Sequence, residues 1–506
     1  MKLFSRIYKA AVLCAATAIM LPAQTVTTLF SFGETNGAYP QAAMVQGTNG
    51  FLYGTTPYGG INCAPTGCGT IFAITPDGTL TTLYSFCAFS QCADGAEPLG
   101  ALIEATNGEF YGTTSAGGSS SYCTPVYGHL AGCGTLFKMT PSGLLTTIYN
   151  FCSQPPCADG SQPTAGLVQA ANGSLYGTTF GGGTNGGGTI FMMTPQGTFT
   201  TIYSFCSQGG GLCTDGRYPG QLVQATNGDL YGTTASGGAW DDNGTVFRIT
   251  PSGTFTTLYS FCPYYDCSDG ASPNGLVQAT DGNFYGTTFI GGSGATGCGS
   301  STAPGCGTVF RITPSGDLYT LYSFTDGDGL MPYAGLVQAT DKNLYGTTSE
   351  AGLYGGGTLF KITPAGLLTA IFNFDYSEGP SAGWWPQSAM VQDTDGNLYG
   401  TTLYGGTDLA CDNPPGCGTI FSLSVGLRPF VKLQPTSGGV GEPVEVLGSN
   451  LTGATAVSFN GTPAIFKIVS NTLITTKVPS GATIGKVQVT TPSGTLVSDV
   501  SFRERP

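Results

Sequence analysis

The chain has 506 residues and a net charge of −13 at pH 7, and only 9% of its residues are charged. Nucleic acids and anionic membrane surfaces bind clusters of Lys and Arg, so this balance argues against both as partners. Gly occurs 81 times, and no long stretch has the apolar spacing of a helix. The composition therefore predicts short strands joined by tight turns.

Residues 1–23 are typical of a secretory signal peptide. Lys2, Arg6 and Lys9 form a basic start, and the apolar run AAVLCAATAIML follows. That run is too short to span a bilayer comfortably, and a small-residue cleavage point precedes Gln24. No later segment is long and apolar enough to cross a membrane. We therefore expect a secreted or bacterial cell-surface protein that does not insert into the membrane.

Residues 24–425 are built from four short sequence words, each of which occurs seven times. The words resemble GLVQAT, YGTT, GT(I/L/V)F and TTLYSF, and they are rich in β-branched and aromatic residues, as strands are. Asn-Gly or Asp-Gly separates the first two words in six of seven copies, and Thr-Pro-x-Gly separates the last two. Both are tight-turn signals. Each unit is predicted to be a four-stranded antiparallel meander, and seven units make an all-β, seven-bladed β-propeller.

The order of the words predicts that the propeller closes on itself. One TTLFSF word, residues 27–32, precedes every complete unit, and the last unit ends at residues 418–424 without its own copy. We therefore expect the strand around Leu29 to Phe32 to pair with the strand from Gly418 to Leu423. A ring closed in this way exposes no complete sheet edge.

These words also carry a family resemblance. The run GCGTIFKITPxGxLTTLYSF, followed by DGxxPxxGLVQATNGxFYGTT, resembles the GloVer (Gloeo/Verruco) tandem repeat of secreted and surface proteins of bacteria, over roughly residues 25–425. The family has no established reaction. The resemblance therefore implies architecture and compartment, and no catalytic residue is carried over from it.

After Leu427 the sequence changes in character. Residues 429–506 contain PTSGGVGEPVEVLGSNL, VSFNGTPA and VPSGATIGKVQVTTPSG. These words are similar to the IPT/TIG domain, an immunoglobulin-like β-sandwich. The resemblance implies a second domain that acts as a spacer or a binding module.

Sixteen cysteines follow Cys14, and they fall into eight local pairs. The pairs are Cys63 with Cys68, Cys87 with Cys92, Cys123 with Cys133, Cys152 with Cys157, Cys206 with Cys213, Cys262 with Cys267, Cys298 with Cys306 and Cys411 with Cys417. Where a repeat lacks one member of a pair, it lacks the other as well, which is the behaviour of disulfides in a secreted chain. Zinc is the alternative, but the chain has one histidine and no CxxC…CxxC set. We expect eight disulfides that stiffen loops, and no metal site.

The connections between strands differ at the two ends of the blades. Successive connections of a meander lie at alternate ends, so the two tight turns share one face, which we call the tight-turn face. The two long, variable connections share the other face, the long-loop face, and they hold all the cysteine pairs and all three tryptophans. Rigid loops that carry aromatic residues favour binding.

Six aromatic residues of the long-loop face are the candidate ligand contacts. They are Trp240, Trp384, Trp385, Tyr264, Tyr265 and Tyr127. The alternative for each ring is packing against a neighbouring loop. Trp384 and Trp385 are expected to be exposed, so replacing both with Ala is expected to abolish binding and leave the fold intact.

Several polar positions have two interpretations. A ring of equivalent positions either lines the channel or bonds the backbone between blades, and we favour the second; it comprises Gln46, Glu104, Gln169, Gln224, Gln278, Gln338 and Gln392. The aspartates of DGxxP suit turns; they are Asp94, Asp159, Asp215, Asp269 and Asp328. We expect no cofactor, with calcium at Asp326 and Asp328 as the alternative. His129 is interpreted as a surface residue.

The function predicted from the sequence is extracellular binding or adhesion, with a glycan or a surface protein as partner and carbohydrate as the expected ligand class. An extracellular polysaccharide lyase or hydrolase that uses Asp241, Asp242 or Asp266 is the first alternative. A purely structural surface component is the second. A deep pocket with converging carboxylates would favour the enzyme, and an aromatic patch would favour the binding protein. We expect a monomer.

Overall fold

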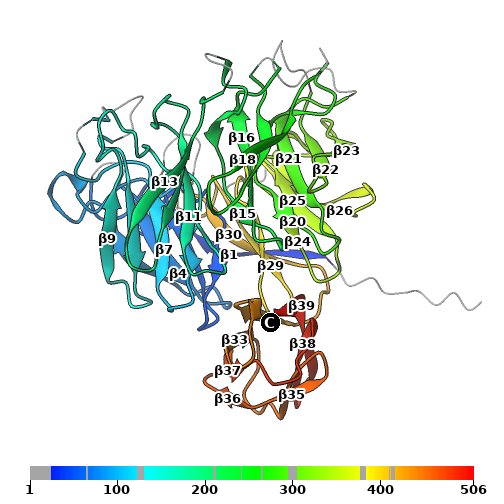
Figure 1. Ribbon diagram of the computed structural model, residues 1–506. Coiled ribbons are helices and arrows are strands. Elements are labelled where there is room, and N and C mark those ends of the chain that lie inside the picture. The colour runs from blue at the N-terminus through cyan, green and yellow to red at the C-terminus, as the bar shows by residue number, and fades with distance from the viewer. Residues whose placement is uncertain are drawn as a thin grey trace, which may run out of the picture.

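The computed structural model describes residues 24–505 except 64–66, 121, 124–129, 209–211, 241, 264–265, 294–304, 377–382, 409–410 and 412–415. The predicted signal peptide lies outside this part of the chain. The described residues form strands, tight turns and one short 3-10 segment, η1 (Ser90–Cys92). Figure 1 shows a ring of sheets above a smaller C-terminal sandwich.

Seven sheets of the same plan form the ring. Blade 1 comprises β2 (Val45–Gln46), β3 (Leu52–Thr56), β4 (Thr70–Ile74) and β5 (Leu80–Ser85). Blade 2 comprises β6 (Ile103–Glu104), β7 (Phe110–Thr114), β8 (Thr135–Met139) and β9 (Leu145–Asn150). Blade 3 comprises β10 (Val168–Gln169), β11 (Leu175–Thr179), β12 (Thr189–Met193) and β13 (Phe199–Ser204).

Blades 4 and 5 each add a short strand ahead of the innermost one. Blade 4 comprises β14 (Arg217–Pro219), β15 (Val223–Gln224), β16 (Leu230–Ser236), β17 (Thr245–Ile249) and β18 (Phe255–Ser260). Blade 5 comprises β19 (Ala271–Pro273), β20 (Val277–Gln278), β21 (Phe284–Ile290), β22 (Thr308–Ile312) and β23 (Leu318–Ser323). Blade 6 comprises β24 (Val337–Gln338), β25 (Leu344–Thr348), β26 (Gly355–Ile362) and β27 (Leu368–Asp375).

Blade 7 joins the two ends of the propeller. It comprises β28 (Val391–Gln392), β29 (Leu398–Thr402) and β30 (Thr419–Ser424), with β1 (Thr25–Ser31) as its outermost strand. Strand β1 is antiparallel to β30, with Phe30 opposite Ile420. The N–H of Phe32 extends the pairing by donating to the carbonyl of Gly418 at 2.9 Å. The predicted closure of the ring is confirmed.

Inside each blade, residues of the different repeated words contact one another. Blade 3 serves as an example. A Cβ atom on Gly177 of YGTT would lie 2.5 Å from Phe191 of the GTIF word, so this glycine makes room for the ring. The hydroxyls of Thr179 and Thr189 are hydrogen-bonded at 2.8 Å. The hydroxyl of Thr178 donates to the carbonyl of Gly220 in blade 4 at 3.0 Å. Gly and the two Thr therefore recur because of packing within a blade and bonding between blades.

The Gln ring bonds the backbone between blades, which confirms the interpretation that we favoured. In each case the side-chain oxygen accepts a backbone N–H from the preceding blade, as Gln224 does from Ala171 at 3.0 Å. The other bonds join Gln169 to Thr106 (2.9 Å), Gln278 to Thr226 (2.8 Å), Gln338 to Thr280 (2.8 Å), Gln392 to Thr340 (3.0 Å), Gln46 to Thr394 (3.3 Å) and Glu104 to Thr48 (2.8 Å). The ring is thus closed twice, by strand pairing and by these side chains.

The aspartates of DGxxP are acceptors for a half-buried tyrosine hydroxyl. Tyr203 donates to Asp215 at 2.8 Å, and the same bond occurs at the four other aspartates. Burial raises the pKa of the Tyr203 hydroxyl, and the bond to Asp215 raises it further. The two repeats that carry Phe30 and Phe372 in place of this tyrosine also lack the aspartate. These aspartates therefore have a structural role, as the turn interpretation expects.

Replacing Asp215 with Ala is expected to destabilise the propeller by about 3 kcal/mol, because a buried carboxylate that accepts several hydrogen bonds is lost. Asp215 is fully buried and accepts bonds from Tyr203, Ser207 and Gln208. The exposed Asp326 provides the control, and Asp326→Ala should change the free energy of unfolding by less than about 0.5 kcal/mol. Urea unfolding measures both changes, and equal effects would refute the structural role.

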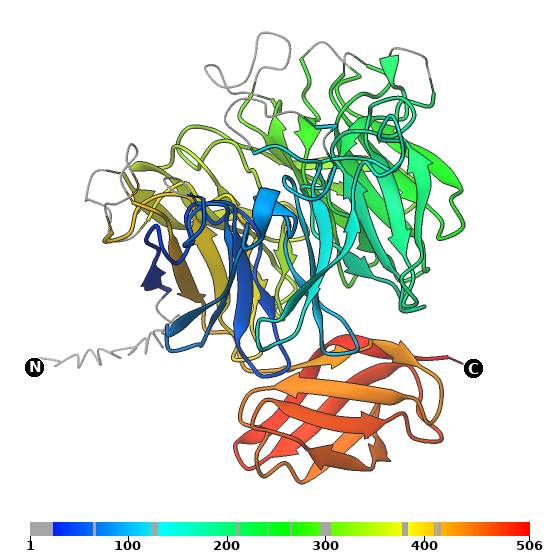
Figure 2. The same ribbon diagram turned by 90° about the vertical axis from the view of Figure 1, so that its left-hand side faces the viewer.

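The C-terminal domain is a β-sandwich that packs on the tight-turn face of the propeller, as Figure 2 shows. Its strands are β31 (Val431–Gln434), β32 (Ser437–Gly438), β33 (Pro443–Gly448), β34 (Ala456–Phe459), β35 (Thr462–Ala464), β36 (Phe466–Ile468), β37 (Leu473–Lys477), β38 (Gly485–Thr491) and β39 (Gly494–Glu504). Val446, Phe459, Val487 and Phe502 lie in its core and are fully buried.

Charged groups lie in the contact between the two domains. The ammonium group of Lys432 donates to the carbonyl of Gln392, and desolvation lowers the pKa of Lys432, an effect that the carboxylates of Asp393 and Asp499 oppose. Asp393 is 2% exposed. Burial raises the pKa of Asp393 to about 6, the charge of Asp395 raises it too, and Lys432 acts against both. The contact therefore favours the neutral acid at Asp393.

The contribution of Asp393 to the stability of the protein is expected to fall as pH rises from 3.8 toward 6, because the folded-state pKa of Asp393 lies above its ordinary value. Protonation favours the folded state below this interval, and that contribution is lost above it. Asp393→Asn keeps the side chain neutral, so it should raise the Tm at pH 8 more than at pH 5. Thermal unfolding at the two pH values measures this, and an equal shift at both would contradict the assignment.

Candidate ligand-binding site

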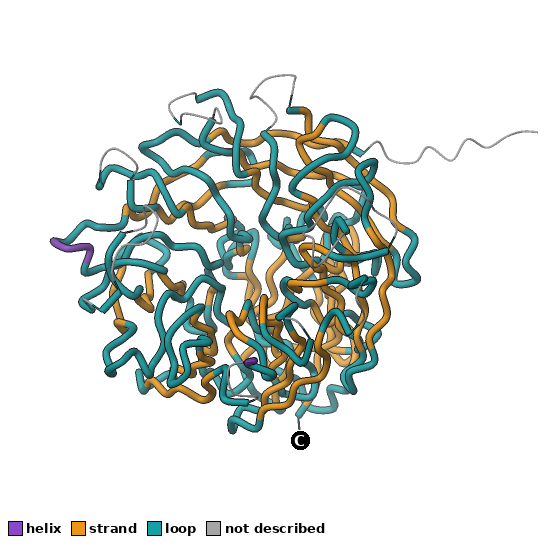
Figure 3. The backbone as a smooth tube through the Cα atoms, turned by 90° about the horizontal axis from the view of Figure 1, so that it is seen from above, coloured by secondary structure: helices purple, strands orange, loops and turns teal. Residues whose placement is uncertain are grey.

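A cavity of about 740 Å³ lies on the axis of the propeller, and residues of all seven blades line it. Most of them belong to the segments that follow the proline of DGxxP and lead into the innermost strands. These segments are 41–43, 99–101, 164–168, 218–223, 273–277, 333–337 and 389–390. Phe180 and Ala235, at the ends of the second strands, complete the wall on the side of the long loops. Figure 3 looks down on that face.

The lining of the cavity is uncharged. Among the described residues, it contains no Asp, Glu, Lys, Arg or His. The side-chain amides of Gln41 and Gln387 line it and make no hydrogen bond to the described residues. Asn274 donates to the carbonyl of Pro332 at 2.7 Å, which fixes the orientation of its amide. The innermost strands are sheet edges, so they turn unpaired backbone groups toward the axis. The cavity can therefore both donate and accept hydrogen bonds.

Two aromatic surfaces flank the polar groups. Phe180 is 40% exposed and stacks on Tyr218 with ring centroids 4.3 Å apart. The guanidinium of Arg217 lies over the same tyrosine, 5.2 Å from its centroid, so Phe180 presents the outer ring of this stack. Tyr333 is 48% exposed and is held by the edge of Phe289 at 5.5 Å. These rings offer apolar faces to a ligand in the cavity.

Small residues permit the close approach of the segments around the axis. A Cβ atom on Gly166 would lie 3.2 Å from the side chains of Ala101 and Gln221. A Cβ atom on Gly335 would lie 3.2 Å from the carbonyl of Gly275. The Gly and Ala residues before the LVQ word therefore set the width of the cavity. This recurrence of small residues was a signal of the site that the sequence analysis missed.

The residue before each of the seven prolines holds these segments in place. It has a left-handed backbone in every blade, with φ of 59° at Tyr39, 55° at Glu97, 54° at Gln162, 59° at Tyr218, 54° at Ser272, 55° at Met331 and 58° at Trp385. Its N–H donates to a carbonyl of the preceding blade, as Trp385 does to Gly356 at 2.9 Å. A non-glycine residue keeps this conformation only where its surroundings impose it. The cavity wall is therefore fixed by bonds between blades.

The predicted tryptophans differ in their environments. Trp240 is 50% exposed. Trp384 is 3% exposed, so its expected exposure is wrong. Its ring packs against Tyr376 and Tyr404, with centroids 4.8 Å away in each case, and Trp385 is partly buried beside it. None of the three lines the axial cavity. Ligand binding by them stays a prediction.

The burial of Trp384 follows from its place in the repeat. Its N–H donates to Tyr404 at 3.1 Å, in a bridge that also forms between Ala38 and Tyr58 and between Ala96 and Ala116. The equivalent Ala38 and Ala96 are buried. The double Ala variant is therefore expected to disturb the fold. Tyr127, Tyr264 and Tyr265 lie outside the described residues.

The candidate carboxylates are engaged elsewhere. Asp242 forms an ion pair with Arg217, in which Nε of the arginine donates to the carboxylate at 3.0 Å. Asp266 is exposed and accepts the N–H of Ser268 at 3.4 Å. Neither lines the cavity, and Asp241 lies outside the described residues, as does His129. At the alternative calcium position, Asp328 accepts bonds from Tyr322 and from Thr325.

Seven of the eight predicted disulfides are present among the described residues. They join Cys63 to Cys68, Cys87 to Cys92, Cys123 to Cys133, Cys152 to Cys157, Cys206 to Cys213, Cys262 to Cys267 and Cys411 to Cys417. Cys306 is also disulfide-bonded, and its predicted partner Cys298 lies outside the described residues.

The second cysteine of several pairs is buried, as Cys213, Cys267 and Cys417 illustrate with exposed fractions of 7%, 0% and 0%. The carbonyl of Cys213 accepts the N–H of Gly238 at 3.0 Å, and Cys267 accepts an equivalent bond at 2.9 Å. The carbonyl of Cys417 accepts the N–H of Tyr39 in blade 1 at 2.8 Å. All three lie outside the lining of the axial cavity, so they belong to the buried frame of the ring and not to the ligand contacts.

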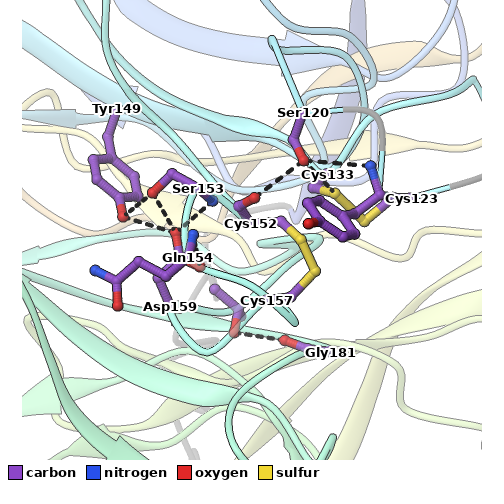
Figure 4. Close-up of a disulfide and its surroundings, with 12 residues drawn as sticks. Ser120, Cys123, Cys133, Tyr149, Cys152, Ser153, Gln154, Cys157, Asp159 and Gly181 are labelled. Carbon is purple, nitrogen blue, oxygen red and sulfur yellow. Dashed lines mark hydrogen bonds between the residues drawn. A yellow bond between two sulfur atoms is a disulfide. The ribbon is translucent and has the colours of Figure 1, made fainter.

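Four of the disulfides lie side by side in two groups of two. In blade 1, and again in blade 2, four cysteine sulfurs lie within 4.8 Å of one another. Figure 4 shows the adjoining disulfides of blade 2, with the bond from Tyr149 to Asp159 beside them. This arrangement raises the zinc alternative again, because four cysteine sulfurs suit that metal.

The repeats answer the zinc alternative. The bond of Cys206 to Cys213 occurs in a repeat that lacks the second pair, and the same is true of the bonds made by Cys267 and by Cys417. Two sulfurs alone would not supply the four ligands that zinc takes, whereas two sulfurs are enough for a disulfide. The pairs therefore act as separate disulfides.

Fold and site together define a disulfide-stapled, seven-bladed propeller with a pocket on its axis. Residues 16–127, 120–298 and 264–461 match the model of the Gloeobacter/Verrucomicrobia repeat, so the chain belongs to this family. Residues 430–503 match the IPT/TIG domain. No curated protein matches the chain. Among the described residues, no helix has the length and apolar character needed to cross a membrane.

Two of the solved structures that match this chain have low sequence identity to it. The extracellular domain described as that of the putative hybrid two component system BT4673 from B. thetaiotaomicron is 11% identical, with a TM-score of 0.49 over 94% of this chain and 58% of that one. PorZ, a surface component of the type-IX secretion system of Porphyromonas gingivalis, is 13% identical, with a TM-score of 0.46 over 94% of this chain and 60% of PorZ. The chain thus spans less than two thirds of either. These similarities carry no argument about function.

Replacing Trp384 with Ala should lower the free energy of unfolding by about 4 kcal/mol, because a large buried ring leaves a cavity. Trp240→Ala removes a half-exposed ring and should cost less than about 0.5 kcal/mol. Thermal or denaturant unfolding of the two variants measures the difference. Equal stability of the two variants would contradict the different environments of these tryptophans.

Proposed function

We propose that the protein is a secreted or surface-exposed binding protein that takes a neutral glycan into its axial cavity from the long-loop face. The single observation that carries this is the chemistry of the lining: uncharged among the described residues, with amides, backbone edges and two aromatic rings. A sugar presents hydroxyls that both donate and accept, and C–H faces that stack on aromatic rings. The cavity volume of about 740 Å³ falls within the range of ligand pockets.

The compartment is supported by the disulfides, which persist in oxidising surroundings outside the cytoplasm. The signal-like sequence at the N-terminus points the same way. Neutral glycans are abundant polymers in that environment, and a stapled propeller suits it because the staples survive there. Secretion and glycan binding are therefore proposed together.

Binding is favoured over cleavage by the chemistry of the cavity wall. A glycosidase uses a pair of carboxylic acids that flank the scissile bond. Among the described residues that line the cavity, none is acidic, and Asp242 is paired with Arg217. An anionic polysaccharide is disfavoured too, because the described lining offers no cationic side chain to neutralise it. The lining thus suits a ligand that is polar but uncharged.

The test uses a glycine of the cavity wall. A Cβ atom on Gly275 would meet only the Cα of Gly335, at 3.8 Å, so Gly275→Leu should fold normally and narrow the cavity. Gly327 lies in an exposed part of a long loop with nothing within 4 Å of such an atom, so Gly327→Leu is the matched control. Malto-, cello-, laminari-, xylo- and manno-hexaose are the probes.

Gly275→Leu is expected to weaken binding of the recognised hexasaccharide at least about tenfold, since the loss of more than about 1.4 kcal/mol has that effect. Gly327→Leu should bind like the parent. Phe180→Ala should weaken binding about fivefold, because aromatic stacking contributes about 1 kcal/mol. Calorimetric titration measures all three, with Tm values as a check of folding. Undiminished binding by Gly275→Leu would move the site elsewhere, and no binding by the parent would refute the function.

A further inference from the structure

We infer that the axial cavity recognises the end of a glycan chain and does not bind internal stretches of it. This rests on the proposed function and adds the mode of recognition. The argument depends on whether a chain can pass through the propeller along its axis. Only a pocket closed at one end restricts binding to chain ends.

The C-terminal sandwich covers the tight-turn end of the axis. Gln434 donates to the carbonyl of Glu104 in blade 2 at 2.9 Å. Thr472 donates to the carbonyl of Thr48 in blade 1 at 3.0 Å. Each acceptor belongs to the Gln ring or to the tight turn that follows it, next to the axis. The sandwich therefore contacts the innermost part of the ring and not the outer rim.

Two further contacts place the sandwich across the axis. Lys432 donates to the carbonyl of Gln392 in blade 7, and Arg503 donates to the carbonyl of Thr226 in blade 4. Blade 4 lies on the opposite side of a seven-membered ring from blades 7 and 1. A domain that bonds the innermost residues on both sides must lie over the centre. Both side views show the sandwich beneath the propeller (Figures 1 and 2).

The cavity itself stops short of this cover. Its lining reaches the first residue of several innermost strands, such as Val168 and Val277, and includes no described residue of the sandwich or of the tight turns. The next residue along each innermost strand belongs to the Gln ring, whose bonds run from blade to blade. The pocket is therefore open at the long-loop face and closed toward the sandwich.

A closed pocket of this shape selects a chain end. An internal stretch of a glycan would have to enter and leave through the same mouth, which needs a sharp reversal between neighbouring sugars. Neighbouring segments of the wall are in contact, as at Gly335 and Gly275, so the wall leaves the chain no second way out between the blades. A terminal sugar enters without bending, and its hydroxyls meet the uncharged lining of the pocket.

The number of protein molecules bound by each glycan chain tests this inference on the full-length protein. The hexasaccharide that binds best in the panel is compared with a soluble longer chain of the same linkage, by calorimetric titration. The expected ratio is one protein per chain at both lengths. A ratio that rises with chain length would overturn chain-end recognition and leave the proposed function standing.

Two further outcomes separate this inference from the proposed function. Gly275→Leu should lose binding to the short and the long chain to the same extent. Retained binding of the long chain alone would overturn chain-end recognition, because it would reveal an internal-chain site elsewhere. If no oligosaccharide of the panel binds to the parent protein, both the proposed function and this inference fail.

Discussion

The pairing of β1 with β30 is the interaction on which the rest of the structure depends. It joins the first strand of the propeller to the last, with Phe30 opposite Ile420. Without it blade 7 would end as an open sheet and the ring would have two free edges. With it, seven innermost strands are brought around one axis, and the cavity exists only because they converge there. The ligand site is a property of the closed ring and not of any one blade.

The repeats divide their residues between structure and recognition. Positions that barely change carry bonds, such as the Gln that accepts an N–H from the preceding blade and the Thr that donates to the next. Positions on either side of the proline before each innermost strand vary from blade to blade, and many of them line the cavity. Gln41, Asn274 and Tyr333 each follow the proline of their blade and differ in chemistry. Seven copies of one rigid frame thus present a wall of mixed side chains.

Much of this fold could be predicted from the sequence, because each position of the repeat occurs in seven copies that can be compared with one another. The blades, the closing strand and the local cysteine pairs followed from the words alone, and the Gln ring followed from the expectation that buried amides are bonded. Trp384 was misjudged because it was treated as an unusual loop residue. Its alignment with the buried Ala38 and Ala96 was available in the sequence and predicts burial.

Other features could not be predicted from the words. The cavity depends on how closely the innermost segments approach, which is set by the size of residues such as Gly166 and Ala101 across blades. The position of the sandwich depends on hydrogen bonds to backbone carbonyls, as from Thr472 to Thr48. Every residue has a backbone carbonyl, so the sequence does not show which ones accept these bonds. Cys417 is a further example: it is buried, and its backbone carbonyl accepts a hydrogen bond from blade 1.

Hydrogen–deuterium exchange of the full-length protein, with and without its bound hexasaccharide, tests the central claim that the ligand occupies the axial cavity. The account predicts that protection on binding is concentrated in the segments before the innermost strands, among them 164–168, 273–277 and 333–337, because their backbone groups face the axis. The tight turns and the sandwich should exchange as before. Protection confined to the outer loops, around Trp240 or beside Trp385, or to the sandwich, would contradict the account.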